Sequence, residues 1–294
     1  MISLEPWWAW LSRQTDRPRH RLVLQLTLVI FLLHGLDHWT WTMLPEKLLA
    51  ATALVRPRLQ GSRWLWLGIS LSLIVNNLWH WSRLVNHEYL YTYWALACTL
   101  AIFSRRSQMI LHYHGRCLIG LCFFFATLWK LIGGEYLDGS FLHATFLLDA
   151  RLAMGAVGMG GLDLETLSQN RQIFAALQSS GPAAPAALLS STGRMALVSQ
   201  ILSYWTILIE GSVAASFLLP WSRLSGIRDW LLLGFIVTTY AVIPVLGFGA
   251  LLVVMGIAQV RSSRLANIYL GSLVLMPLWM PLPQGIFWLI QQIA

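Results

Sequence analysis

The chain has 294 residues, a formal net charge of +8, and a composition that is 57% hydrophobic and only 11% charged. Soluble domains carry about 25% charged residues, so this composition argues against a soluble protein and predicts an integral membrane protein. Most of the arginines lie between the apolar runs, where lipid headgroups are the expected partner. The sequence shows neither a basic helix face nor an aromatic stacking module, and we therefore expect no nucleic-acid binding.

Apolar runs of membrane length recur from one end of the chain to the other. They predict an all-α fold: a polytopic transmembrane helix bundle, with residues 1–294 forming a single integral membrane domain. About 20 apolar residues are needed to cross a bilayer. We predict about seven spans, within a range of six to eight, at 22–44, 64–83, 88–104, 110–132, 195–219, 229–258 and 267–290. Basic residues divide almost evenly between the two sides, so the orientation stays open.

Two segments outside these spans are predicted to lie along the membrane surface. Residues 44–55 could form a short interfacial helix. Residues 133–194 form one long interfacial connection without an independent domain. Within this connection an amphipathic helix is expected at 161–178, with four apolar side chains roughly on one side: Leu164, Leu167, Phe174 and Leu177.

The sixth and seventh predicted spans contain prolines. Pro244 and Gly247 could kink or break the sixth, and Pro277 is the first of three prolines in the seventh. Broken spans of this kind also occur in transporters, which keeps a transporter as a third, lower-ranked interpretation.

The first polar group at membrane depth lies in the stretch HGLDHW. His34, Asp37 and His38 occupy positions i, i+3 and i+4, which share one face of a helix. They could ligate a metal, or the carboxylate could orient a histidine for proton transfer, or the three could simply pack between helices near a helix end. A first-row metal usually needs further ligands, so we favour a buried polar cluster and assign no metal site.

The second group lies in the stretch NNLWHWSRLVNHEYLY. Asn76, His80, Arg83 and His87 would form one stripe if a single helix ran through all four. Alternatively, residues 83–88 form a loop and His80 lies at the membrane interface. The spacing does not decide between these two interpretations.

The third group is Lys130, one of only two lysines in the chain; the other is Lys47. A lysine near a helix end can extend its ammonium group to the headgroups. Arginine would serve that purpose equally well, and arginine supplies every other basic position. Lysine differs because burial readily removes its proton, which allows it to act as a base. This difference favours a functional role for Lys130.

The fourth group is Glu210, near the middle of its predicted span. A lone acid at this depth must be paired with a base or protonated. Lys130 or one of the histidines is the expected partner, and a neutral glutamic acid hydrogen-bonded in the core is the alternative.

Two motifs resemble the membrane domain of the vitamin K-dependent γ-carboxylase and the related bacterial proteins grouped as the horizontally transferred transmembrane domain family. The stretch VNHEYLYTYWALACTLAIF, residues 85–103, is similar to that family's Asn-Asn-His-x-Tyr-Leu stretch entering a span. The stretch CLIGLCFFFATLWKLIGGEYLDG, residues 117–139, is similar to the family's Phe-rich run that ends in Lys-Leu, a spacer, an aromatic-Leu pair and Gly. The span with Glu210 is similar to the family's acid-bearing span.

In that family the lysine of the Lys-Leu motif deprotonates a reduced quinone, and the motif histidine supports it. The resemblance therefore implies that Lys130 is the base and His87 its support, with Glu210 completing the catalytic set. Six further residues are candidates for lining the substrate pocket: Asn86, His80, Asn76, His34, Asp37 and His38.

The resemblance implies an enzyme or redox protein that acts on a lipid-soluble quinone, in a bacterial inner membrane or a thylakoid-type membrane. The alternative is a non-catalytic subunit of a larger membrane complex, whose intramembrane His and Glu residues bind pigment, quinone or metal. The sequence does not identify a cofactor, although a quinone or quinol fits both interpretations. The lipid bilayer is the one partner that both require.

Overall fold

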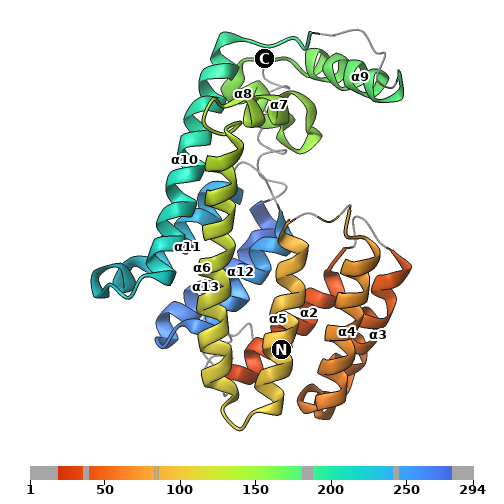
Figure 1. The fold of residues 1–294 in the computed structure, drawn as a ribbon, viewed down its shortest axis with the longest axis vertical. Helices are drawn as coiled ribbons and strands as arrows, with labels where there is room; N and C mark the ends of the chain where they lie inside the picture. Colours follow the sequence, from red (N-terminus) through yellow and green to blue (C-terminus); the bar gives the residue numbers. More distant parts are fainter. Residues whose placement is uncertain are drawn as a thin grey trace, which may run out of the picture. The chain divides into compact units, whose positions relative to one another are not determined.

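The computed structural model describes residues 19–35, 40–82, 84, 86–180, 188–240 and 245–279. Every regular element in these ranges is a helix, so the all-α class is confirmed. The chain divides into two compact units, which we describe separately (Figure 1). Unit 1 comprises Met1–Cys122, Ala214–Leu233 and Val245–Pro277. Unit 2 comprises Phe123–Val213, Gly234–Pro244 and Leu278–Ala294.

Unit 1 is built mainly from six α-helices and two short 3-10 helices. The α-helices are α2 (Arg19–Leu33), α3 (Leu44–Val55), α4 (Arg63–Trp79), α5 (Asn86–Phe103), α12 (Leu246–Gln259) and α13 (Ser263–Trp279). The 3-10 helices are η1 (Trp41–Met43) and η2 (Pro57–Gly61). Helix α3 packs against α2 and α4, α4 packs against α5, and α12 packs against α2.

Polar side chains inside unit 1 are paired across these helix contacts. Trp94 on α5 is fully buried and its indole N–H donates to Thr27 on α2 over 2.9 Å. Asn77 on α4 donates to Thr92 on α5 over 2.8 Å. Hydrogen bonds of this kind remove the cost of burying polar groups and fix which helix faces meet.

Unit 2 contains the second part of α6 (Ser107–Gly133), most of α10 (Gly193–Leu218) and the helices between them. These are α7 (Ser140–Leu148), the 3-10 helix η3 (Ala150–Leu152), α8 (Ala153–Gly160) and α9 (Leu164–Ser180). The remaining helix, α11 (Ser222–Tyr240), contributes to both units. Figure 1 shows α7 and α8 beside the upper ends of α6 and α10, with α9 to their right.

Helix α9 corresponds to the surface helix expected at 161–178. Leu167 is fully buried in an apolar cluster with Phe146 and Met195, whereas Leu164 and Phe174 remain partly exposed. Asn170 exchanges two hydrogen bonds of 2.8 Å with the backbone of Ser190, which ties α9 to the segment leading into α10. The connection between α6 and α10 thus packs as part of unit 2.

The structure corrects the boundary of the first predicted span and bears out the break expected in the sixth. Helix α2 ends at Leu33, so the single helix predicted over 22–44 is wrong. Gly35 has a φ of 64°, in the left-handed region that commonly follows a helix end. The break expected in the sixth span, 229–258, is confirmed, because Val245 is not helical and α12 begins only at Leu246.

Two of the described helices, α6 and α10, are long and apolar enough to cross a membrane. They have 27 and 26 residues respectively. Helix α12 is the shorter apolar helix, with 14 residues. Length and composition thus support a membrane location at two positions of the described chain.

Candidate functional site

Lys130 and Glu210 form a closely spaced ion pair in unit 2. Lys130 lies in the last turn of α6 and Glu210 lies on α10. The Nζ atom of Lys130 is 2.5 Å from Oε2 of Glu210, and the two side chains are only 12% and 9% exposed. A pair this short and this buried is held by both charge and a hydrogen bond. Glu210 therefore has the basic partner that a buried acid requires.

An aromatic side chain follows the pair where α6 ends. Gly134 has a φ of 77°, which a glycine adopts without the steric cost that other residues incur. The chain then turns, and the ring centroid of Tyr136 lies 5.0 Å from Nζ of Lys130. A cation over an aromatic face is attracted to the ring electrons. Burial, and secondly the charge of Glu210, raise the pKa of Tyr136, so its phenol stays protonated.

An open groove lies beside this aromatic side chain. Tyr136 stacks on Phe141, with ring centroids 4.7 Å apart, and Phe141 also lines the groove. The groove has a volume of about 620 Å³ and is walled mainly by α7, with Glu135, Asp149 and Phe174 completing it. Small-molecule sites typically have volumes of about 300–1,000 Å³ and mostly apolar walls. An apolar ligand in this groove would lie two stacked rings away from Lys130.

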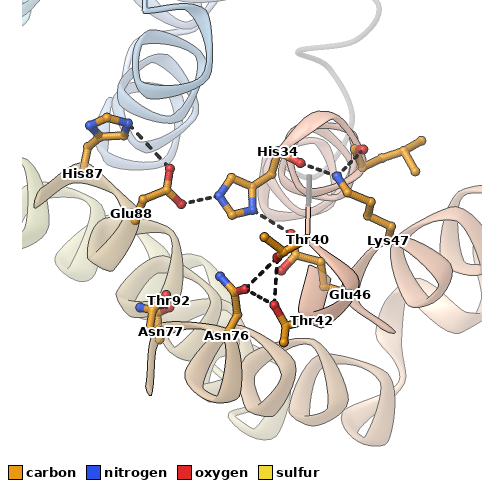
Figure 2. A network of polar contacts seen from close by, with 11 residues as sticks. His34, Thr40, Thr42, Glu46, Lys47, Asn76, Asn77, His87, Glu88 and Thr92 are labelled. Carbon is orange, nitrogen blue, oxygen red and sulfur yellow. Dashed lines mark hydrogen bonds and ion pairs between the residues drawn. The ribbon is translucent and has the colours of Figure 1, made fainter. Parts of the chain in front are cut away.

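A second set of buried ionisable groups lies in unit 1, where His34 stands between two glutamates (Figure 2). Nδ1 of His34 is 2.8 Å from Glu46 on α3, and Nε2 is 2.5 Å from Glu88 on α5. All three side chains are at most 4% exposed. The ring of Tyr91 stacks on His34 with centroids 4.2 Å apart and fixes the orientation of the imidazole.

The two contacts of His34 determine a proton count. Each contact needs one hydrogen between a ring nitrogen and a carboxyl oxygen. Without it both atoms are hydrogen-bond acceptors, and they would repel each other. A neutral imidazole supplies only one N–H. The cluster of His34, Glu46 and Glu88 therefore holds one further proton, either on the ring or on one of the acids.

Lys47, the second lysine, lies next to this cluster. Its Nζ atom donates to the carbonyl oxygen of Leu32 over 3.1 Å and also to that of His34. These carbonyls belong to the C-terminal end of α2, which favours a positive charge. With the additional proton counted, the charges of His34, Glu46, Glu88 and Lys47 sum to zero.

Asn76 and His80 lie beside the same cluster but do not form the predicted stripe. Helix α4 ends at Trp79 and α5 begins at Asn86, so no single helix runs from Asn76 to His87. Asn76 is fully buried and accepts a hydrogen bond from Thr42, which also lies 3.2 Å from Nε2 of His80. Of the two interpretations left open by the sequence, the continuous stripe is therefore excluded, because α4 ends one residue before His80.

His87 lies on α5 in unit 1, with its Nε2 atom 3.7 Å from Oε1 of Glu88. Its ring also approaches Phe248 on α12, with centroids 5.7 Å apart. Lys130 and Glu210 belong to unit 2. The support that the resemblance assigns to His87 therefore stays a prediction.

The remaining candidates lie outside the described residues. These are Asp37, His38 and Arg83, together with the side chain of Asn86. Within the ranges that the structure describes, no group of three or more His, Cys, Asp or Glu residues is arranged to hold a metal ion. The ring nitrogens of His34 are both directed at carboxylates.

Sequence reasoning missed Glu46 and Glu88, the two acids that surround His34. A signal was present for each. Glu46 is the only acid in the apolar helix α3, and Glu88 directly follows His87. Residues 44–55 were interpreted as an interfacial helix, in which an acid needs no partner, so Glu46 was not considered as buried.

Comparisons with protein-family models, with curated proteins and with solved structures found no match for this chain.

Proposed function

We propose that the chain is a multi-pass membrane protein similar to the γ-carboxylase membrane domain, in which Lys130 and Glu210 accept a proton from a reduced quinone. The observation that carries this proposal is the buried 2.5 Å contact between Lys130 and Glu210. This contact joins the lysine and the acid that the resemblance assigns to catalysis. The two residues lie on α6 and α10, the two described helices of membrane length.

The surfaces of α6 and α10 support the membrane location. On α6, Phe125, Trp129 and Ile132 are all at least 60% exposed. Their spacing of four and three residues places them on one helix face. Helix α10 has a similar exposed stripe of Leu197, Ile201, Tyr204 and Leu208. Apolar stripes of this size are unfavourable in water and favourable against lipid, which supports a membrane location for α6 and α10.

The ion pair sets conditions on how Lys130 could act as a base. At rest, the carboxylate of Glu210 and the ring of Tyr136 both stabilise the ammonium form of Lys130. A free amine arises when the proton moves from Nζ of Lys130 to Oε2 of Glu210, which leaves both groups neutral. The amine then takes the proton of a quinol hydroxyl, and the quinolate lies beside the new ammonium. The pair thus accepts one proton per turnover.

The groove beside Tyr136 supports a lipid-soluble substrate. Its walls include Phe141, Leu148 and Phe174, which suit a flat apolar ring system. Phe141 contacts Tyr136, and Tyr136 contacts Lys130, so a quinol ring bound there is separated from the base by these two rings and reaches it only by moving past them.

The test uses the full chain purified in mild detergent, with a reduced naphthoquinone as substrate and dissolved dioxygen as the oxidant of the quinolate. Dioxygen consumption should fall at least about tenfold in Lys130→Arg, because the guanidinium group stays protonated at any working pH. Lys130→Ala should lose the same activity. Lys47→Arg is the matched control and should keep it. Full activity of Lys130→Arg would refute the proposal that Lys130 acts as the base.

The alternative function is a non-catalytic subunit of a larger membrane complex. The exposed aromatic and aliphatic stripe of α6 would then face another subunit. An absorption spectrum and an organic extraction of the purified chain distinguish the two functions. Bound pigment without quinone would favour the subunit, whereas bound quinone that is lost in Lys130→Arg would favour the base.

A further inference from the structure

Four ionisable side chains of unit 1 follow one another in an alternating chain of acids and imidazoles (Figure 2). Glu46 contacts Nδ1 of His34 at 2.8 Å, and Nε2 of the same ring contacts Glu88 at 2.5 Å. The second oxygen of Glu88 lies 3.7 Å from Nε2 of His87. Each inner residue uses two different atoms for its two neighbours, which is the arrangement that lets a proton enter at one atom and leave from another.

Exposure changes steadily along this chain. The side chain of His87 is 32% exposed, that of Glu88 4%, that of His34 3% and that of Glu46 0%. His87 is therefore the end at which a proton can be exchanged with the surroundings. Glu46 is the closed end, and its Oε2 atom is buried without a hydrogen-bond partner.

We propose that Glu46, His34, Glu88 and His87 form a proton relay. The relay stores one proton at its buried end and exchanges it at its outer end. The relay rests on contacts within unit 1 alone and stands independently of the function proposed for Lys130. It goes beyond the support expected of His87, since it makes that residue the outlet of a buried proton store.

The transfer balances in protons and charge. The proton on Nε2 of His34 moves to Oε2 of Glu88 and leaves a neutral imidazole whose Nδ1–H still donates to Glu46. Glu88 then rotates or is bridged by one water, because 3.7 Å is longer than a direct hydrogen bond. The proton passes to Nε2 of His87, which becomes an imidazolium, and Glu88 is again ionised. The reverse sequence refills the store.

The described residues around this store hold the imidazole of His34 and balance its charge. Lys47 on α3 donates to the carbonyl of His34 and compensates the second carboxylate. His80 contacts Thr42 rather than either acid, and Tyr91 stacks on the imidazole with its ring face. Helix α12, which packs on α2, has no titratable side chain in its described range of Leu246–Gln259.

The experiment follows the histidine ring nitrogens of the full-length chain in detergent by nitrogen NMR. The chain has eight histidines, and His34→Gln and His87→Gln assign the two signals of interest. Groups that share protons titrate as a coupled system. The relay predicts that the His34 signal shows a second inflection at the pH at which His87 titrates.

Glu88→Gln breaks the link with a side chain of the same shape and should remove this inflection. Glu165→Gln, an exposed acid of α9, is the matched control and should leave it unchanged. A wild-type His34 signal with no inflection at the His87 midpoint would overturn the relay, and that measurement needs no variant of the acids. An inflection that persists in Glu88→Gln would overturn it as well. Neither readout depends on quinol oxidation.

Discussion

The charges of buried carboxylates are neutralised in different ways in the Lys130–Glu210 pair and in the His34 cluster. In unit 2 one acid meets one ammonium, so the charges cancel within two residues. In unit 1 two acids share one imidazole, and neutrality is reached only with an additional proton and with Lys47. The first arrangement can release a free amine by moving a single proton. The second is a store, because its additional proton is held between two acceptors.

The comparison predicts that breaking the His34 cluster destabilises the protein most. His34→Leu would remove the imidazole that faces both Glu46 and Glu88, although both carboxylates are almost fully buried. Removing one partner of a buried charged group typically costs about 3–5 kcal/mol. We expect a loss of this size in the free energy of unfolding, measured by denaturant titration in detergent. A loss below that of Lys130→Leu would contradict the ranking.

Lys130→Leu should cost less, about 2 kcal/mol, because Glu210 alone can take up a proton and become neutral. The double variant Lys130→Met with Glu210→Leu sharpens this prediction. A well-packed apolar pair often replaces a buried ion pair without loss. We therefore expect its unfolding free energy to return to within about 1 kcal/mol of the wild type, while the dioxygen consumption of the quinol assay stays lost.

Lys47→Met should have the smallest of these effects, about 1–2 kcal/mol, from the loss of its hydrogen bonds to the end of α2. Lys47→Arg keeps the charge and the donors and should stay within about 0.5 kcal/mol of the wild type. Thermal unfolding of the two variants side by side measures the difference. Equal losses in both would show that the shape of the lysine, rather than its donors, matters at this position.

The sequence predicted the features that depend on local pattern. The all-α class, the helix near α9 and the pairing of Glu210 with a basic side chain all follow from apolar periodicity and from the cost of burying charge. The contact between Lys130 and Glu210 joins residues 80 positions apart. The depth of Glu210 in its predicted span suggested this contact, since a lone buried acid needs a basic partner or a proton.

Features that depend on how segments pack could not be predicted in this way. The end of α2 at Leu33 made room for α3 to fold back, and that packing placed Glu46 against His34. A continuous span over 22–44 would have put Glu46 beyond the end of the same helix. The gap between α4 and α5 likewise separated Asn76 from His87, because spacing alone does not show where a helix ends.

The two lysines allow one direct measurement of the central claim, that Lys130 receives the quinol proton. Labelling the lysine side chains with carbon-13 should give two Cε signals, assigned by Lys47→Arg. On addition of a reduced naphthoquinone, we predict that the Lys130 signal shifts, that the Lys47 signal stays, and that Glu210→Gln alters the response. A Lys130 signal that is unchanged by the quinol would contradict the account.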